Sequence, residues 1–328
     1  MTKLLVVIGI TGQQGGSVAS LFSQEPGWKV RGITRNPSSP SALAWISKGV
    51  EMVQADLNEP STLLSAFIGA TALFVTTNFW APFYNPRTLS LLKENQTLGE
   101  YCSDLEFRAA KNAFDAASQV QALERIVVSS LVDAEKLSGG KYKGVYHWEG
   151  KAAALKYLKE TYPDLAGKLS VVVMGNYMGN WLEDLKLRKT EAGYRLALVG
   201  SGTTPLPHID AERDTGYIVR ALLECSPGKT VLGAGEMISW SDMLKVWCEV
   251  NKVEFGGFDP LSVDQFTRFI PVPGLGRELG EMFAFMDEFG YAGGDPDVVR
   301  PSELGVPCSV TSWKDWVERK DWSKVLKA

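Results

Sequence analysis

Cysteine and histidine are scarce in this chain of 328 residues, which contains four cysteines and two histidines. The cysteines are too far apart to form a CxxC pair, since they stand at Cys102, Cys225, Cys248 and Cys308. This spacing argues against a disulfide scaffold and against a structural zinc site. We therefore expect no metal, and we expect a reducing compartment, the cytoplasm or the nucleus.

Long hydrophobic runs and an excess of positive charge are also absent. No stretch approaches the roughly 20 apolar residues of a membrane-spanning helix. The apolar run at residues 4–8 is too short for a secretory signal and leads directly into a glycine turn, which indicates a strand. The 34 Lys and Arg against 38 Asp and Glu give a net charge of −4 with no basic block. A small molecule, rather than a membrane or a nucleic acid, is therefore the expected partner.

Glycine, in contrast, is abundant, and three glycines follow the first apolar run at regular spacing. Residues 4–8 are β-branched or aliphatic, as in a strand buried on both faces of a parallel sheet. A helical pattern begins after the glycines, so backbone N–H groups and the positive end of the helix dipole meet at one point, where pyrophosphate binds. The GxxGxxG spacing predicts a dinucleotide site formed by Gly9, Thr11, Gly12, Gln13, Gln14 and Gly15.

Short aliphatic runs alternate with helical patterns in the first half of the chain, which is typical of βαβ units. Right-handed crossovers then give an α/β fold, a doubly wound parallel sheet of the Rossmann type. The expected strands after the first are residues 28–34, 50–53, 72–76, 125–129 and 169–174. The expected helices are residues 14–24, 40–48, 60–67, 105–119 and 148–161.

The rhythm is broken in two places, and we expect both to form a cap over the sheet. Residues 78–104 make a long connection rich in aromatic residues and proline, and the pattern loosens again after residue 175. We therefore expect an NAD(P)-binding domain at 1–175 and a smaller mixed C-terminal cap at 176–328, to which 78–104 contributes.

No acidic residue follows the second expected strand, where NAD-binding folds usually place one. In such folds an Asp or Glu about 20 residues past the glycines pairs with the ribose 2′-hydroxyl. Arg35 stands there in this chain. A guanidinium suits a 2′-phosphate, so NADP(H) is favoured over NAD, with an exposed arginine that binds no ligand as the alternative.

The ends of the third and fourth expected strands should complete the cofactor site. Asp56, followed by Leu57, stands where such folds hydrogen-bond the adenine amino group, although capping of the helix near residue 60 explains it equally well. Thr76, Thr77 and Asn78 end the fourth strand, where backbone groups pass along the ribose and the pyrophosphate.

Several motifs together resemble the NmrA-like family, atypical short-chain dehydrogenase/reductase relatives close to the isoflavone-reductase-like enzymes. The resemblance covers nearly the whole chain and rests on residues 9–18, 74–80, 126–131, 147–151, 176–181, 210–216 and 313–316. It implies NADP(H) binding and either a reductase or an NADP-sensing regulator. Family members usually follow the sixth strand with Arg-Pro, whereas this chain has Met174 and Gly175, a departure that concerns the loop and the floor of the pocket.

The tyrosine of short-chain reductases is missing from its usual place, four residues before the lysine that holds the nicotinamide ribose. Lys151 is expected to contact that ribose, and His147 occupies the tyrosine position. Either His147 or Tyr146 could donate the proton, although Tyr146 lies about 100° away round a helix. Capping or packing remains the alternative for His147. Ser129 and Ser130 occupy the place of the reductase serine, with Ser130 counted as catalytic and Ser129 with the cofactor.

Aromatic residues gather in segments expected to meet at the nicotinamide end. They favour a bulky, flat, apolar substrate over a small polar metabolite. Tyr177 is counted with the cofactor site. The residues expected to contact substrate are Phe79, Trp80, Phe83, Tyr84, Trp148 and Trp181.

Three functions fit these residues. The preferred one is an NADPH-dependent reductase of a bulky aromatic or conjugated small molecule, of the kind found in secondary metabolism. The second is a non-catalytic redox sensor that binds NADP and a protein partner. The third is a cyclase or isomerase that keeps NADP as a wall of its pocket.

Overall fold

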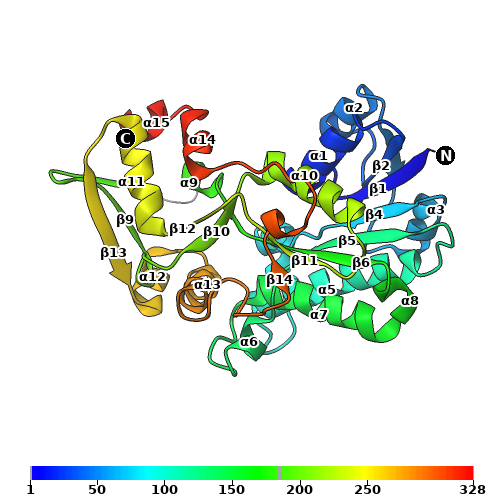
Figure 1. Ribbon diagram of the computed structural model, residues 1–328. Helices are drawn as coiled ribbons and strands as arrows, with labels where there is room; N and C mark the ends of the chain where they lie inside the picture. Colours follow the sequence, from blue (N-terminus) through cyan, green and yellow to red (C-terminus); the bar gives the residue numbers. More distant parts are fainter. Residues whose placement is uncertain (1, 184–186, 328) are drawn as a thin grey trace.

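An eight-stranded parallel sheet forms the centre of the larger lobe of the protein (Figure 1). This computed structural model describes residues 2–183 and 187–327. From one edge to the other, the strands are β3 (Glu51–Gln54), β2 (Trp28–Thr34), β1 (Lys3–Ile8), β4 (Ala72–Val75), β5 (Arg125–Ser130), β6 (Leu169–Met174), β11 (Thr230–Gly233) and β14 (Val298–Val299).

The strand order reverses beside β1, which pairs with β2 on one side and with β4 on the other. In the register of β1, Val6 lies opposite Arg31 of β2 and Leu73 of β4. In a doubly wound sheet, ligands bind at this reversal, at the carboxyl ends of the strands. The predicted Rossmann-type α/β fold is confirmed.

The two faces of the sheet are covered by different helices, because successive strand residues point to opposite sides. On β1, Leu5 and Val7 pack in one buried cluster, and Val6 and Ile8 pack in another. The helices of the first cluster are α1 (Gln13–Phe22), α2 (Pro40–Ile46) and α10 (Ala211–Glu224). The second cluster includes, on this face of the sheet, α3 (Leu63–Phe67), α5 (Leu98–Ala117), α7 (Tyr146–Thr161) and α8 (Pro163–Ala166), with the 3-10 turn η1 (Pro60–Thr62) before α3.

The larger lobe takes up chain from beyond residue 175, the boundary expected from the sequence. Strands β11 and β14 extend the sheet past β6, and α10 packs on α1. Helix contact is close because Gly216 of α10 has no side chain: a Cβ there would lie 2.7 Å from the Ser17 carbonyl oxygen. The Ser17 hydroxyl donates to the Arg213 carbonyl oxygen at 2.8 Å. The 3-10 turn η3 (Pro301–Glu303) follows β14.

The smaller lobe contains two mixed three-stranded sheets, in agreement with the smaller mixed cap expected from the sequence (Figure 1). One sheet has the order β12 (Glu236–Ile238), β10 (Leu206–Ile209), β7 (Asn176–Tyr177), and the other has the order β13 (Phe255–Leu261), β9 (Gly193–Val199), β8 (Arg188–Thr190). The helices here are α9 (Asn180–Glu183), α11 (Trp240–Asn251), α12 (Val263–Phe269), α13 (Leu275–Phe289), α14 (Trp313–Glu318) and α15 (Ser323–Lys327).

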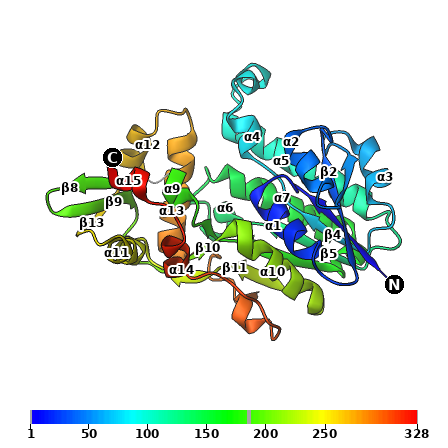
Figure 2. The ribbon, with the colours of Figure 1, turned by 90° about the horizontal axis from the view of Figure 1, so that it is seen from above.

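The connection after β4 projects from the larger lobe, as Figure 2 shows at α4 (Trp80–Phe83). It continues through η2 (Pro86–Leu91), and its buried residues Phe79 and Phe83 pack with Leu275 of α13. The long helix α5 begins at Leu98 rather than near residue 105. A capping box explains the earlier start: the Glu100 N–H donates to the Thr97 hydroxyl at 3.2 Å, and the Thr97 N–H donates to the Glu100 carboxylate at 2.8 Å.

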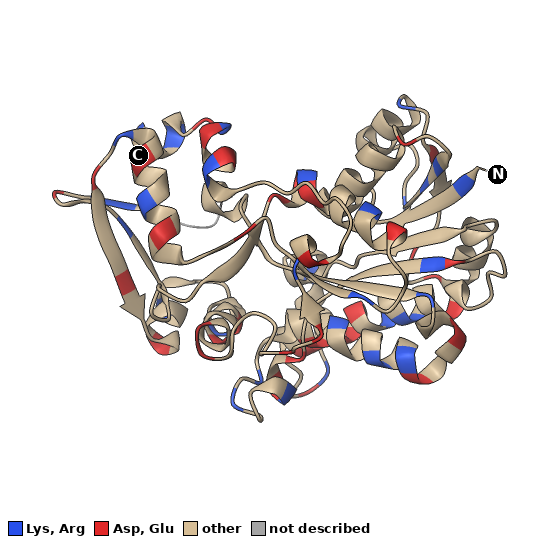
Figure 3. Ribbon diagram, in the orientation of Figure 1, with Lys and Arg blue, Asp and Glu red and all other residues tan. Residues whose placement is uncertain are grey.

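Charge is mixed along the ribbon. Lys and Arg alternate with Asp and Glu over both lobes (Figure 3). Within the described residues, no helix combines the length and the hydropathy needed to cross a membrane.

The short helix α6 (Ala134–Leu137) links β5 to the segment before α7.

Candidate functional site

The glycine loop between β1 and α1 is tightly packed on one side and open on the other. Gly9 has φ +78°, and a Cβ there would lie 2.6 Å from Thr76 Cγ2. A Cβ on Gly15 would lie 2.3 Å from the Gly9 carbonyl oxygen, so helix and loop can approach only without it. A Cβ on Gly12 would have one neighbour, the Gly9 oxygen at 3.4 Å. Gly12 therefore leaves the backbone open where a ligand can approach.

The N-terminus of α1 is free of competing groups. Its N-cap residue Gly12 makes no side-chain capping bond, and the first turn contains no acidic residue. Thr11 and Gln13 are exposed beside it. Since the first N–H groups of a helix have no partner within the helix, they can bind an anion here. These residues fit the pyrophosphate of a dinucleotide.

Arg35 follows β2 at the same edge of the sheet and is exposed. Its guanidinium makes no ion pair or hydrogen bond within residues 2–183 and 187–327. Only its carbonyl oxygen is bound, by the Gln54 side-chain amide at 3.2 Å. The arginine side chain is therefore available for a phosphate.

The Asp56 side chain makes hydrogen bonds within its own loop, and it does not cap the helix near residue 60 as considered from the sequence. Its carboxylate accepts from the Asn58 N–H at 2.9 Å and from the Asn58 amide at 3.2 Å. The N-cap of η1 is Glu59, which makes no side-chain capping bond. The neighbouring Leu57 carbonyl oxygen accepts from Asn112 of α5 at 2.7 Å. This loop is thus held in place at the end of β3.

Gln14 and Tyr177, both expected at the cofactor, lie together. The Gln14 amide donates to the Tyr177 hydroxyl at 2.6 Å, which joins α1 to β7. The Gln14 side-chain oxygen is buried and has no partner within the described residues. Burial raises the pKa of Tyr177 above its ordinary value, so the hydroxyl keeps its proton.

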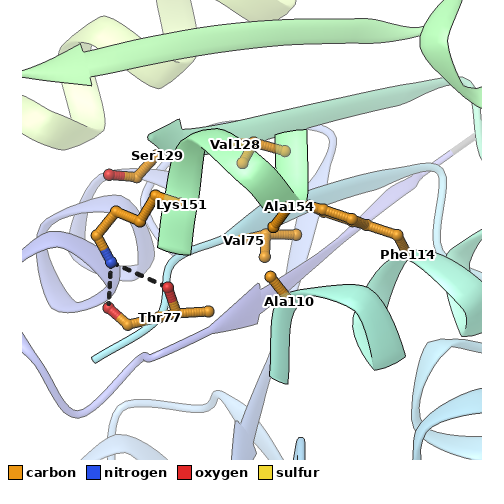
Figure 4. Close-up of a pocket in the computed structure, with 8 residues that line it drawn as sticks. All are labelled: Val75, Thr77, Ala110, Phe114, Val128, Ser129, Lys151 and Ala154. Carbon is orange, nitrogen blue, oxygen red and sulfur yellow. Dashed lines mark hydrogen bonds between the residues drawn. The ribbon is translucent and has the colours of Figure 1, made fainter. Parts of the chain in front are cut away.

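Lys151 of α7 reaches across to the end of β4 (Figure 4). Its ammonium donates to the Thr77 hydroxyl at 3.0 Å and to the Thr77 carbonyl oxygen at 3.3 Å. It also forms an ion pair with Glu106 of α5, to which the Thr77 hydroxyl donates at 2.7 Å. A cavity of about 10 Å³, room for one water molecule, lies between Lys151, Thr77 and Ser129.

Glu106 is a site residue that the sequence analysis missed. It is 3% exposed, and its Oε2 atom has no partner within the described residues. The available signal is its position on the buried face of α5, where the other members are small or apolar: Cys102, Ala110, Ala113 and Ala117. A glutamate on such a face calls for a buried partner.

The two serines at the end of β5 differ. Ser129 lines the small cavity beside Lys151. Ser130 is 1% exposed, and its hydroxyl donates to the neighbouring Leu131 carbonyl oxygen at 3.3 Å. Ser129, rather than the Ser130 that we counted as catalytic, shares the lining of this cavity with the lysine.

His147 lies one helical turn before Lys151, because α7 begins at Tyr146 and both residues are within the helix. Its Nδ1 atom is 2.8 Å from Glu278 Oε1 of α13. Its ring centroid is 4.9 Å from that of Trp80 and 5.8 Å from that of Phe79. The imidazole thus joins the aromatic group that follows β4.

Tyr146 faces a different element. Its ring lies against the first turn of α5, where a Cβ on Gly99 would be 2.2 Å from Tyr146 Cδ2. Burial raises the pKa of Tyr146 above its ordinary value. A tyrosine that donates a proton in this fold has its pKa lowered by the lysine, so the geometry favours His147 over Tyr146.

Four of the six aromatic residues expected at the substrate lie in one group with His147. Phe79 stacks on Phe83 at 5.6 Å, and Trp80 stacks on Tyr84 at 5.9 Å. Trp80 is partly exposed and Tyr84 is exposed, so they offer the open face of this group.

Trp148 and Trp181 have packing roles in this structure. Each is 1% exposed. Trp148 contacts Phe285, Tyr291 and the edge of the His147 ring, and Trp181 contacts Trp313. Because both rings are enclosed by the core, neither presents a face to a ligand. Their large apolar area, rather than a pocket, explains their position.

A second acid, Glu149, is half-buried on α7 near the carboxylates of α13. Burial raises the pKa of Glu149 to about 7, and nearby Glu135, Asp133, Glu278 and Glu281 add to the effect.

Among the residues that the structure describes, no group of three or more His, Cys, Asp or Glu is arranged to hold a metal ion.

Two fungal relatives are both named NmrA-like family domain-containing oxidoreductases. FrzB of Cladobotryum sp is 32% identical over 187 residues, which cover 56% of this chain and 49% of FrzB. The match thus spans about half the length of that relative. malD of Malbranchea aurantiaca is 26% identical over 357 residues, covering 99% of this chain and 98% of malD.

Solved structures share the fold over nearly the whole chain. NmrA, a negative transcriptional regulator, in complex with NADP has a TM-score of 0.73 and 16% identity, covering 97% of this chain and 95% of NmrA. The triphenylmethane reductase of Citrobacter sp., complexed with NADP(H), has a TM-score of 0.69 and 18% identity, covering 97% and 99%. Identities this low establish the fold alone.

The family itself is established by sequence. The model of the NmrA-like family matches residues 1–324, nearly the whole chain. The glycine loop, the lysine of α7 and the aromatic segment after β4 all lie within the match. The protein belongs to the NmrA-like family.

Proposed function

We propose that this protein is an NADPH-dependent reductase of a bulky aromatic or conjugated small molecule. One observation carries the proposal: Lys151 and His147 lie one turn apart on α7, beside an aromatic group and at the sheet edge that bears the glycine loop. A cation for the ribose, a proton donor and a flat apolar wall are the groups such a reduction needs.

The cofactor, when bound, supplies a hydride from its nicotinamide ring. The open backbone at Gly12 and the uncapped N-terminus of α1 would hold the pyrophosphate. Lys151 would hold the nicotinamide ribose after releasing one of its contacts to Thr77. The free guanidinium of Arg35 would pair with the 2′-phosphate, which is why we propose NADP(H) rather than NAD(H).

The substrate class is inferred from the group around His147. Trp80 and Tyr84 offer ring faces at its open side. Flat aromatic molecules stack on such faces with a gain of about 0.5–1.5 kcal/mol for each ring pair. The relatives are named oxidoreductases, which supports a reduction, and the Citrobacter enzyme is named a triphenylmethane reductase, which supports an aromatic substrate.

The test is single-turnover oxidation of bound NADPH with a panel of flat electrophiles: a triphenylmethane dye, a naphthoquinone, an aromatic imine and an aromatic enone. The proposal expects loss of the reduced-nicotinamide absorbance with at least one of them, and loss of that reaction in Lys151→Met. If NADPH binds and every member of the panel leaves the absorbance unchanged, the reductase assignment fails.

A redox sensor is the second candidate, favoured by two features of the site and by one structural neighbour. The tyrosine position holds His147, and Lys151 already has a buried anionic partner in Glu106. The structural neighbour NmrA is a transcriptional regulator. A sensor would bind NADPH and NADP⁺ with different affinities and reduce nothing, so calorimetry with both forms, combined with the turnover panel, separates the two functions.

A further inference from the structure

Helix α7 begins without a cap of its own. Its N-cap residue is Val145, whose side chain cannot accept a hydrogen bond. Glu278 of α13 supplies an acceptor for the first turn of the helix, and Glu281 of α13 holds the residue before the N-cap. Glu278 Oε1 accepts from the His147 N–H at 2.9 Å, and Glu281 Oε2 accepts from the Gly144 N–H at 2.8 Å. The helix that carries His147 and Lys151 is therefore fixed by the smaller lobe.

Glu278 does more than cap the helix, because the same Oε1 atom also contacts the imidazole at 2.8 Å. Glu278 is 2% exposed and His147 is 7% exposed, so water competes little for this contact. A carboxylate can only accept hydrogen bonds, so His147 Nδ1 must carry the proton. In the neutral ring the lone pair is then on Nε2, which makes no hydrogen bond within the described residues.

We infer that Glu278 is a positioning residue for His147, and that the pair delivers the proton of the reduction through His147 Nε2. This inference rests on the proposed function and names the proton path of the same site. As hydride reaches the electrophilic carbon of the substrate, the π electrons of the reduced bond move to the neighbouring atom. That atom takes the Nε2 proton of the imidazolium. The ring that remains is neutral, keeps its Nδ1–H bond to Glu278 and regains a proton from solvent.

The direction of the effect follows from charge. A carboxylate on Nδ1 stabilises the imidazolium and sets the orientation of the ring, as a buried acid does in other acid–base pairs. The imidazole packs against Trp80 and Phe79 in tilted arrangements, with interplanar angles of 44° and 53°, so packing also restricts the rotation of the ring. Proton transfer from Nε2 then occurs next to the aromatic group where a flat substrate would stack.

Other ionisable groups surround the pair, and most of them are acids. Arg277, 63% exposed, pairs with Glu281 at 2.8 Å and faces away into solvent. Lys151 is neutralised by Glu106. The groups on the neighbouring elements are Glu278, Glu281 and Arg277 on α13, Tyr146, Glu149 and Lys151 on α7, Glu100, Cys102 and Glu106 on α5, and Asp133 and Glu135 at α6.

Two matched variants separate positioning from simple capping. Glu278→Gln keeps an oxygen that can cap the His147 N–H but removes the charge from Nδ1. Glu281→Gln changes the neighbouring carboxylate, which accepts from the Gly144 N–H before the N-cap and does not contact the imidazole. A purely structural role predicts that the two variants behave alike, and the positioning role predicts that only Glu278→Gln alters the imidazole.

Nitrogen-15 NMR of the imidazoles gives a readout that needs no substrate. The chain has two histidines, so His147→Gln assigns the signals. We expect the neutral His147 ring to carry its proton on Nδ1. We expect the Nδ1 signal of the neutral ring to move in Glu278→Gln, because the acceptor loses its charge, and to stay near its wild-type position in Glu281→Gln. A proton on Nε2 in the neutral wild-type ring, or equal Nδ1 signals in the two variants, overturns the inference.

The kinetic arm uses whichever electrophile of the panel oxidises bound NADPH. We expect His147→Gln to slow the single turnover about 10²–10⁴-fold. Glu278→Gln should slow it at least about tenfold and change its pH profile, with NADPH affinity retained, whereas Glu281→Gln should keep the wild-type profile. Wild-type rates in Glu278→Gln overturn the proton path. Complete lack of turnover with NADPH bound overturns the reductase assignment instead, and the NMR result still decides the pair.

Discussion

At the scale of single residues, Lys151 and Glu106 form a buried pair whose members come from α7 and α5. The Lys151 side chain is 14% exposed and that of Glu106 is 1% exposed. Removing one member of such a pair leaves the other charge without compensation in a poorly solvated place. The pair therefore links the stability of the helix contact to the orientation of the cofactor lysine.

We expect Glu106→Ala to lower the free energy of unfolding by about 3–5 kcal/mol, because Lys151 then lacks its anionic partner. The double variant Glu106→Ala with Lys151→Met should be clearly more stable than the single variant. Urea denaturation of the wild type, both single variants and the double variant gives the coupling energy. Additive losses would show that the two side chains stabilise the fold independently.

Arg35 is the residue on which the choice of cofactor rests. Arg35→Ala should weaken NADPH binding about 10- to 150-fold, the loss of one charge-assisted contact, and leave NADH binding nearly unchanged. Arg87, an exposed arginine of η2, provides the control variant Arg87→Ala. Calorimetry with both cofactors decides, and equal weakening of NADPH and NADH would remove the assignment.

The buried His208 and the half-buried Glu149 should give opposite pH dependences of stability. Burial lowers the pKa of His208 to about 3 from 6.5, so below pH 6.5 the unfolded chain binds a proton that the folded chain does not, and stability falls as pH falls. Burial raises the pKa of Glu149 to about 7 from 4.5, so between these values the folded chain holds the extra proton, and stability falls as pH rises.

The two slopes, each about 1.4 kcal/mol per pH unit at most, oppose each other between pH 4.5 and 6.5. Single variants should reveal them. In this window, the free energy of unfolding of His208→Leu should fall with rising pH relative to that of the wild type. The free energy of unfolding of Glu149→Gln should instead rise with pH relative to that of the wild type. Urea unfolding across the window measures both. Parallel curves for the two variants would contradict the burial of one of these groups.

At the scale of elements, the packing of α10 on α1 determines where the glycine loop lies. Gly216→Val would push a side chain against the Ser17 backbone, since even a Cβ would lie 2.7 Å from the Ser17 oxygen. We expect a loss of about 1–3 kcal/mol in stability and weaker NADPH binding, because the N-terminus of α1 must shift. Gly167→Ala is a suitable control, since a Cβ there would lie an ordinary 3.5 Å from the Asp164 carbonyl oxygen. Unchanged NADPH affinity in a folded Gly216→Val would separate α10 from the cofactor site.

The elements of the first half could be predicted because local pattern and burial agree there. The ends of β2 and β6 coincide with the expected residues 28–34 and 169–174. The expected start of α5 near residue 105 is too late, because the capping box of Thr97 and Glu100 begins the helix at Leu98. Short apolar runs bounded by turns predict strands well when both faces of the sheet are covered.

Side-chain partners across the chain could not be predicted in the same way. Glu278 and His147 are 131 positions apart, and no local pattern in α13 indicates which helix it will cap. Likewise, β11 and β14 join the large sheet from a region whose pattern is loose. Such contacts depend on the tertiary arrangement, which sequence periodicity does not encode.

At the scale of the whole molecule, the candidate site is assembled from both lobes. The larger lobe contributes the glycine loop, Arg35 and Lys151 at the carboxyl edge of the sheet. The smaller lobe contributes Tyr177, which holds Gln14, and Glu278, which holds His147. Binding a dinucleotide at the sheet edge would therefore bring together groups that are far apart in sequence but fixed by the packing of the two lobes.

The central claim is that the glycine loop at the start of α1 binds the cofactor, and calorimetric titration of NADPH into wild type and Gly12→Glu tests it most directly. Gly12 has an extended backbone and open space for a side chain, so the variant should fold normally. A carboxylate placed there should repel the pyrophosphate, and we expect binding at one site in the wild type and at least about 100-fold weaker binding in the variant. No uptake of NADPH or NADP⁺ by the folded wild type, or equal affinity in Gly12→Glu, would contradict the account.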